Sequence, residues 1–286
     1  MSETPFDAAA AALRQGDAAG ARALLARAAE AGDARAAAVH ANFLASGVGG
    51  PRDWPGALAR LRELAGANRR AARELALIEK MALIPEGDPV ALPRGEIVCE
   101  RPRILRFAAL LTREEGRYLA EAALAMLRPA VVVDPATGEQ RPDPVRVADA
   151  IGFTAPLENP AVHALNRRFA AASGTAPEQG EPLQVLRYRP GGEYRTHCDA
   201  LPGLANQRVM TLLVWLNDGY RGGATAFPAA KLALRGAPGD AILFVNAGPD
   251  GRADPAAAHA GLPVEAGEKW MASRWIRARP YSEYGA

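Results

Sequence analysis

Two histidines and one aspartate in this chain have the residue types and spacing of a metal site. His197 and Asp199 form a His-x-Asp pair, and His259 follows further along the chain. In a strand, residues two apart point to the same face, so both members of the pair could reach one ion, with Cys198 on the opposite face. Two histidines and one carboxylate leave other coordination positions open, as non-haem Fe(II) oxygenases require. The sequence therefore predicts an iron site made of His197, Asp199 and His259.

A His-x-Asp pair is common by chance, so its surroundings matter. Here Lys269 follows His259 by ten residues, and the combination is more specific than the pair alone. Simpler interpretations are a surface pair for His197 and Asp199, a core histidine for His259, and a solvated charge for Lys269.

Composition describes a folded protein and excludes several classes. The chain has 286 residues, is 49% hydrophobic and 23% charged, and suits one large or two smaller domains. A net charge of +2 does not indicate nucleic-acid binding. There is neither an apolar run of spanning length nor a signal peptide, so no membrane contact is expected. Cys99 and Cys198 do not form a disulfide framework, and we expect reduced thiols and a cytoplasmic protein.

The N-terminal part is expected to be an all-α helical-repeat domain over residues 1–84. Helix-forming Ala, Leu, Arg and Glu dominate residues 6–84. Residues 25–36 align with 61–72 at an offset of 36, an interval typical of stacked helical hairpins. The stretch resembles short tetratricopeptide-like (Sel-like) repeats, with Asp53 as a candidate helix cap after the inter-helix loop. An Ala-rich bundle that only supports the rest of the chain is the alternative.

A proline-rich linker is predicted at residues 85–95, followed by a second domain at 96–286. A strand is expected over residues 97–107, helices from Thr112 to about residue 127 and from Asn159, and a turn at 134–138. Short strands separated by turns are predicted from there on, at 183–189, 209–216, 224–227, 232–234, 240–245 and 270–276. The second domain is therefore predicted to be α+β, with an antiparallel sandwich or barrel.

Five stretches in the second domain resemble the prolyl 4-hydroxylase-like 2-oxoglutarate/Fe(II) dioxygenases. They are LQVLRYRPGGEYRTHCD (183–199), RVMTLLVWLN (208–217), GGATAFP (222–228), GDAILF (239–244) and HAGLPVEAGEKW (259–270). They occur in the family's order and cover most of the C-terminal two thirds. The resemblance implies a double-stranded β-helix, or jelly roll, with the metal at one open end.

The resemblance also assigns roles to individual residues. His197, Asp199 and His259 would bind Fe(II), and Lys269 would pair with the distal carboxylate of 2-oxoglutarate. Tyr188 matches the family tyrosine that helps to hold this co-substrate, although it could also be plain sheet packing. O2 is the second co-substrate, and ascorbate is the reductant that the family implies. Thr225 would line the sheet interior or the rim of the pocket, where it could contact substrate.

Two departures from the family pattern concern the ligand sites. Relatives commonly have Tyr where this chain has Trp215; its indole could still contact the co-substrate, but it donates a hydrogen bond and cannot accept one. Relatives often have Arg-Thr-Ser near the substrate groove, and this chain has Arg146-Val-Ala148. Arg146 is retained as a substrate-binding candidate, while the missing hydroxyls weaken the case for a collagen-like substrate.

The leading hypothesis is a 2-oxoglutarate- and O2-dependent hydroxylase of a protein or peptide side chain, with prolyl as a candidate. Helical repeats favour a macromolecular partner, because stacked hairpins present concave surfaces. Alternatives are a hydroxylase of a small metabolite or free amino acid, a non-catalytic repeat scaffold with a vestigial jelly roll, and a jelly-roll protein using another divalent metal. The sequence does not indicate an oligomeric state.

Overall fold

A computed structural model describes residues 4–133, 140–142, 145–248 and 250–283. The chain forms two compact units. One comprises residues 1–92, 153–177 and 282–286, and the other comprises residues 93–152 and 178–281. Within the described ranges, no helix has the length and apolar character needed to cross a membrane.

The first unit is built from stacked antiparallel helices. Its first five helices are α1 (Pro5–Arg14), α2 (Ala18–Glu30), α3 (Ala34–Ser46), α4 (Trp54–Ala65) and α5 (Arg69–Ile78). Each helix contacts the next one in the chain, as expected for helical hairpins. The aligned residues Leu25 and Leu61 are both buried. Asp53 caps α4 as predicted, because its side chain accepts a hydrogen bond from the backbone N–H of Gly56 at 2.9 Å.

A sixth helix belongs to the same unit, although it comes from the middle of the chain. Helix α7 (Pro160–Ser173) begins after the predicted cap Asn159 and contacts α3 and α5. Its Arg167 is fully buried and pairs with Asp88, which holds the segment after α5 against it. The first break between the units, after residue 92, falls inside the linker expected at 85–95. Residues 153–177, which were expected in the second domain, join the first unit because α7 packs on the helices that precede the linker.

The second unit contains two main antiparallel sheets. The larger has the strand order β1 (Glu96–Glu100), β2 (Arg103–Phe107), β13 (Ala241–Val245), β9 (Arg208–Trp215), β16 (Lys269–Arg277), β7 (Leu183–Tyr188), β6 (Asp149–Phe153) and β3 (Arg128–Pro129). The smaller has the order β12 (Leu232–Leu234), β11 (Thr225–Phe227), β14 (His259–Gly261) and β8 (Tyr194–His197). Two pairs complete the unit: β10 (Tyr220–Gly222) with β15 (Val264–Gly267), and β4 (Val131–Val133) with β5 (Gln140–Pro142).

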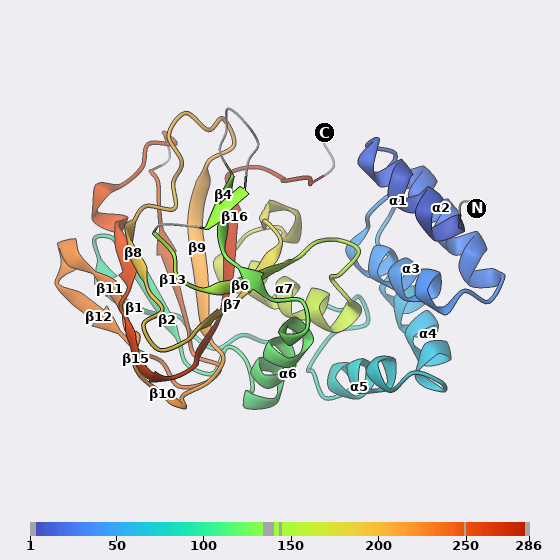
Figure 1. Ribbon diagram of the computed structural model, residues 1–286, viewed down its shortest axis with the longest axis horizontal. Coiled ribbons are helices and arrows are strands. Elements are labelled where there is room, and N and C mark those ends of the chain that lie inside the picture. Colours follow the sequence, from blue (N-terminus) through green and yellow to red (C-terminus); the bar gives the residue numbers. More distant parts are fainter. Residues whose placement is uncertain (1–3, 134–139, 143–144, 249, 284–286) are drawn as a thin grey trace. The chain divides into compact units, whose positions relative to one another are not determined.

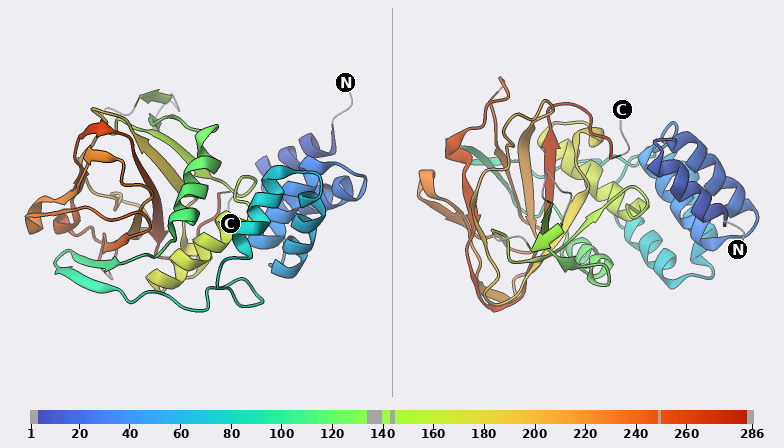
Figure 2. Two further views of the ribbon diagram at one scale, coloured as in Figure 1. Left: turned by 90° about the horizontal axis from the view of Figure 1, so that it is seen from below. Right: turned by 45° about the horizontal axis from the view of Figure 1, so that its top comes forward.

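The two main sheets face each other and enclose a core. Figures 1 and 2 show β11 and β12 on one side of this unit and β7 and β16 on the other. Across the space between the sheets, the ring of Phe227 on β11 meets the ring of Phe244 on β13 with their centroids 5.1 Å apart. Phe244 also meets the ring of His259 on β14 at 4.6 Å. This is the predicted jelly roll, and helix α6 (Arg113–Leu124) lies on its larger sheet beside β7.

Most of the predicted elements occur where they were expected, and the exceptions have local causes. The helix after Thr112 is α6, and Thr112 and Glu115 form its capping box. The segment 97–107 is a hairpin, β1 and β2, and not one strand, because the chain turns at Arg101 and Pro102. The short strands β3, β4, β5, β6, β10, β14 and β15 were not predicted. The turn expected at 134–138 lies outside the described residues.

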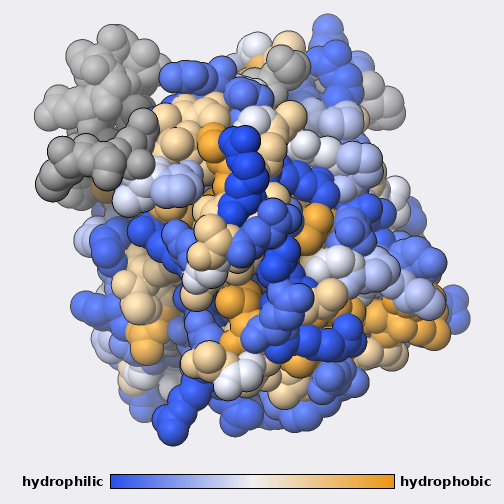
Figure 3. Space-filling model, turned by 90° about the vertical axis from the view of Figure 1, so that its right-hand side faces the viewer, coloured by the Kyte–Doolittle hydropathy of each residue, from blue (hydrophilic) through white to orange (hydrophobic). Residues whose placement is uncertain are grey.

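One surface of the molecule is shown by hydropathy in Figure 3. Hydrophilic side chains predominate on this face, and the hydrophobic residues occur in small groups between them. This is the usual appearance of a protein surface in water, which always exposes some apolar area.

Candidate metal centre and co-substrate pocket

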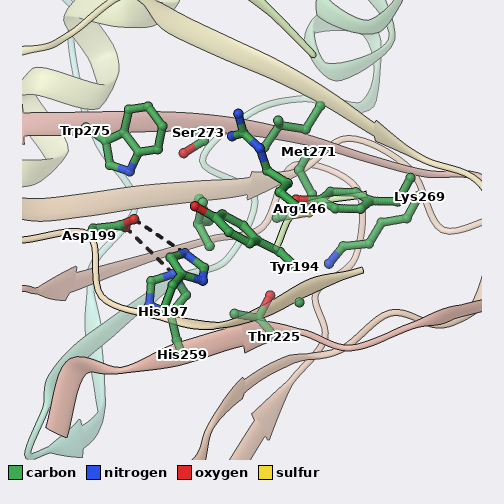
Figure 4. Close-up of a pocket in the computed structure, with 14 residues that line it drawn as sticks. Arg146, Tyr194, His197, Asp199, Thr225, His259, Lys269, Met271, Ser273 and Trp275 are labelled. Carbon is green, nitrogen blue, oxygen red and sulfur yellow. Dashed lines mark ion pairs between the residues drawn. The ribbon is translucent and has the colours of Figure 1, made fainter. Parts of the chain in front are cut away.

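His197, Asp199 and His259 meet at the edge where β8 pairs with β14. His197 ends β8 and His259 begins β14, and the two are directly opposite in the register of the pair. Asp199 lies in the bend that follows β8, so this turn, and not strand alternation, brings it back to His197. Oδ1 of Asp199 lies 3.5 Å from Nε2 of His197, and Oδ2 of Asp199 lies 3.7 Å from Nε2 of His259 (Figure 4). Among the described residues this is the only group of three such side chains placed to share an ion.

The two histidines are oriented by main-chain carbonyls. Nδ1 of His197 lies 2.8 Å from the carbonyl oxygen of Arg195, and Nδ1 of His259 lies 3.1 Å from that of Ala257. A carbonyl oxygen only accepts hydrogen bonds, so each Nδ1 carries the proton and donates. Each Nε2 is then left with its lone pair, which is the form in which a neutral imidazole binds a metal.

The electrostatics of the centre favour an ionised carboxylate at Asp199. Asp199 is buried, which on its own raises the pKa of its carboxyl group. The interactions of Asp199 with His197, His259 and Thr211 outweigh burial and hold this pKa well below its usual range. Burial lowers the pKa of His259. The centre therefore offers one negative oxygen ligand, together with the two Nε2 atoms that the carbonyl contacts of Nδ1 leave available, and this set fits Fe(II).

A narrow pocket extends from this centre toward Lys269. Lys269 begins β16 and lies opposite Tyr188 of β7 in the register of the two strands. Its ammonium nitrogen is 5.4 Å from the centre of the Tyr188 ring, and the residue is only 3% exposed. Figure 4 shows the Lys269 side chain reaching into the pocket at the end away from Asp199. The other lining residues are Arg146, Leu186, Tyr194, Leu213, Thr225, Gly261, Met271, Ser273 and Trp275.

The Lys269 ammonium is a buried cation. Among the described residues no carboxylate forms an ion pair with it. Burial, together with the charge of Arg235, lowers the pKa of Lys269 to about 8. A buried cation in this state is complementary to an anionic ligand, because such a ligand restores the electrostatic stabilisation that water would provide.

The pKa of Lys269 predicts how 2-oxoglutarate binding depends on pH. The pKa is lowered to about 8, so Lys269 is protonated below that pH and loses its charge as the pH rises through it. We expect the Kd for 2-oxoglutarate, measured by titration with the metal-loaded enzyme, to be flat from pH 6.5 to 7.5 and to rise up to about tenfold per unit above pH 8. A Lys269→Arg variant removes this alkaline rise, because its guanidinium stays charged. A flat Kd up to pH 9.5 in the unmodified protein would contradict the assignment.

Thr225 and Arg146 are both placed at the pocket. Thr225 begins β11, is 2% exposed and lines the pocket wall. Arg146 lies at the opening, where its guanidinium is 5.3 Å from the centre of the Tyr194 ring and donates to the side-chain oxygen of Gln184 at 3.4 Å. Their positions are compatible with substrate contacts, and those roles stay predictions.

Trp215 is not among the residues that line the pocket. It ends β9, is 1% exposed, and packs against the loop that precedes β13. A Cβ atom at Gly236 of that loop would lie 2.3 Å from Trp215 Cε3, so the indole fills the space that glycine leaves. The structure therefore places Trp215 in the core beside the pocket, where it does not line the co-substrate site.

Several residues of the site were not predicted. Met271, Ser273 and Trp275 line the pocket because they follow Lys269 at intervals of two along β16. This alternation is visible in the sequence and could have identified them. Thr211 and Asn246, which are hydrogen-bonded behind Asp199, are separated from it in the sequence, and no local pattern marks them.

A jelly roll that brings two histidines, one carboxylate and a buried lysine into one pocket defines the class of 2-oxoglutarate- and Fe(II)-dependent oxygenases. Residues 183–277, which include all four side chains, match the family model of the 2OG-Fe(II) oxygenase superfamily.

Comparison with known proteins identifies the family more closely. The chain is 33% identical over 243 residues to prolyl 4-hydroxylase 1 of Arabidopsis thaliana, covering 78% of this chain and 85% of that protein. It is 32% identical over 189 residues to the prolyl 4-hydroxylase subunit alpha-1 of Gallus gallus, covering 63% of this chain and 36% of the relative. The viral collagen prolyl hydroxylase of Paramecium bursaria Chlorella virus-1, solved with 2-oxoglutarate, aligns with a TM-score of 0.51 and 28% identity over 64% of this chain and 99% of that one.

The chain belongs to the prolyl 4-hydroxylase family of 2-oxoglutarate/Fe(II) oxygenases. It is a 2-oxoglutarate-dependent dioxygenase that uses Fe(II) and O2. The predicted fold class and enzyme class are thereby confirmed.

Proposed function

We propose that this enzyme hydroxylates prolyl side chains of a peptide or protein, with Fe(II) held by His197, Asp199 and His259. One observation carries the proposal: the three candidate metal ligands and the buried cation of Lys269 lie at opposite ends of one pocket. When bound, the iron supplies the redox chemistry, in which 2-oxoglutarate and O2 give succinate and CO2 while the second oxygen atom goes to the substrate.

The pocket supports this assignment by its polarity. A 2-oxoglutarate molecule has a carboxylate at each end, and the pocket is polar at each end. Between them, Leu186, Leu213 and Met271 give an apolar wall that suits the methylene groups of the co-substrate. Lys269 then binds the distal carboxylate, and Tyr188 packs beside the same end.

A peptide substrate is supported by the shape of the opening and by the relatives. Arg146 lines both the pocket and an adjoining open groove. The groove also contains Val147, Ala148, Asp149, Arg187, Arg189 and Pro190. An open groove beside a narrow pocket suits an extended chain that inserts one side chain. The named relatives are prolyl 4-hydroxylases, and one is a collagen prolyl hydroxylase.

The proposal has two further parts, the reductant and the location. Ascorbate would act as the reductant that restores Fe(II), as the family resemblance implies. A cytoplasmic location is supported by Cys99 and Cys198, which are both free thiols.

The substrate proposal is tested by turnover with defined substrates. The full chain is incubated with Fe(II), 2-oxoglutarate, O2 and ascorbate, with either proline-containing peptides or free L-proline. We expect succinate formation and one added oxygen atom on peptide proline, detected by mass spectrometry, and no reaction with a peptide in which alanine replaces proline. Hydroxylation of free proline alone would favour a small-metabolite enzyme, and absence of any 2-oxoglutarate turnover would favour the scaffold hypothesis.

A further inference from the structure

Two buried polar side chains lie behind Asp199 on the side of the larger sheet. The hydroxyl of Thr211, on β9, donates to Oδ2 of Asp199 at 2.6 Å. The side-chain nitrogen of Asn246, directly after β13, donates to the oxygen of the same hydroxyl at 2.8 Å. Thr211 is 0% exposed and Asn246 is 1% exposed, so water does not compete for either hydrogen bond.

The chemistry of the three groups fixes the direction of this chain of hydrogen bonds. An ionised carboxylate only accepts, so the single hydrogen of the Thr211 hydroxyl must be directed to Asp199. The hydroxyl can then only accept from Asn246, which requires the NH2 group of that side chain, and not its oxygen, to face Thr211. In the opposite orientation the amide oxygen of Asn246 would face the hydroxyl oxygen of Thr211, and two acceptors would meet without a hydrogen between them. Each group therefore has one allowed orientation.

The main chain of Asn246 is fixed on both sides. Its N–H donates to the carbonyl oxygen of Val209 at 2.8 Å, and its carbonyl accepts from the N–H of Asp254 at 2.8 Å. Asp254 caps the short helix Pro255–Ala257, and the carbonyl of Ala257 accepts from Nδ1 of His259. Asn246 is thus hydrogen-bonded to the supports of two of the three proposed ligands, through its side chain to Asp199 and through its main chain toward His259.

We infer that Thr211 and Asn246 are positioning residues of the metal centre, which fix the orientation of the Asp199 carboxylate before a metal binds. The inference rests on the proposed function, because it assigns a role relative to the same metal. Thr211 binds Oδ2 from the side of the sheet, so the carboxylate cannot rotate freely. Partners that hold a ligand in this way typically change metal affinity by about 10–100-fold.

Loss of the Thr211 hydroxyl has two opposing effects. A carboxylate without this donor is a more basic ligand, which favours metal binding. It is also free to turn and has lost a hydrogen bond that no water replaces, since the site is buried. We expect the loss of orientation to dominate, because the centre supplies only one carboxylate and both its neighbours are fixed by carbonyls.

The test uses Mn(II) alone as a probe of the centre, with the full chain and without 2-oxoglutarate. Free Mn(II) in solution gives an electron paramagnetic resonance signal that decreases on binding, so the Kd is obtained by titration. Thr211→Val keeps the side-chain shape and removes the hydroxyl, and we expect a Kd increase of about 10–100-fold. Thr211→Ser restores the hydroxyl and is expected to stay within about threefold of the unmodified protein. Asn246→Leu leaves the hydroxyl without its fixed donor, and a smaller increase than for Thr211→Val is expected.

Ile242→Val is the matched control. Ile242 lies on β13, is 0% exposed and is opposite Leu213 in the register of β13 and β9. Its replacement removes a methyl group from the same sheet without touching Asp199, so the melting temperature falls while the Kd for Mn(II) stays unchanged. The ligand-field spectrum of bound Co(II) is a second measurement, expected to differ from wild type in Thr211→Val and to return in Thr211→Ser.

The outcomes separate this inference from the proposed function. Unchanged Mn(II) affinity in a folded Thr211→Val protein overturns the inference while leaving the metal site intact. If Thr211→Val does not fold, Asn246→Leu decides, and unchanged affinity there overturns the inference as well. If the unmodified protein does not bind Mn(II), or if His197→Ala binds it equally well, the proposed metal centre itself is wrong.

Discussion

Replacing His197 by alanine is expected to lower turnover of 2-oxoglutarate by about 1,000-fold or more, corresponding to about 4 kcal/mol of transition-state stabilisation. The substitution removes one of three ligands and also one partner of Asp199, whose carboxylate oxygen lies 3.5 Å from Nε2 of this histidine. No other described residue is placed to replace it, because His259 and Asp199 complete the only such group. The measurements are succinate formation and iron retained after anaerobic gel filtration.

Thr196→Ala is the control for this experiment. Thr196 is the neighbour of His197 on β8 and is exposed, so its replacement tests whether a change in this strand alone disturbs the centre. We expect normal iron content and turnover. A His197→Ala protein that retains iron and activity would show that the metal is held elsewhere.

The three proposed ligands could be predicted from the sequence because the His-x-Asp pair, His259 and Lys269 each stand within a recognisable motif. The reason given for their convergence was only partly right. His197 and Asp199 were expected to share a strand face, whereas β8 ends at His197 and a bend brings Asp199 back. The two histidines meet because β8 and β14 are paired with these residues in register, and that pairing depends on strands too short to be recognised from their sequence.

The two residues behind Asp199, Thr211 and Asn246, could not be predicted for a different reason. Thr211 and Asn246 reach Asp199 only because β9 and β13 are neighbours in the larger sheet. Sheet order depends on long-range pairing, which residue types do not encode locally. Trp215 shows the same limit: its position in the family motif suggested a co-substrate contact, but packing against Gly236 keeps its indole out of the pocket lining.

The domain boundary illustrates how tertiary contacts override sequence order. The proline-rich stretch at residues 85–95 looks like a linker, yet Arg167 of α7 pairs with Asp88 inside it. The helix that precedes β7 thus belongs with the N-terminal helices by its contacts. Composition alone marks where regular structure stops, and it does not show which later segment returns to pack there.

Replacing Lys269 by methionine is expected to weaken 2-oxoglutarate binding by about 100-fold, because losing one member of a buried charge pair costs about 2–5 kcal/mol. The same change is expected to leave the ligand-free protein as stable as before or more stable. Lys269 is 3% exposed and has no carboxylate partner among the described residues, so the unliganded fold carries the cost of burying an ammonium. Methionine fills a similar volume without that cost.

Weaker 2-oxoglutarate binding without a loss of stability would distinguish a binding role of Lys269 from a structural one. The melting temperature of each protein is measured with and without 2-oxoglutarate in the presence of Mn(II). The unmodified protein is expected to melt higher when 2-oxoglutarate is added, and Lys269→Met is expected to lose this increase while its ligand-free melting temperature does not fall. Lys231→Met, at an exposed lysine of the same unit, should keep the increase. If Lys269→Met is destabilised yet binds 2-oxoglutarate normally, the lysine serves the fold and another group must hold the distal carboxylate.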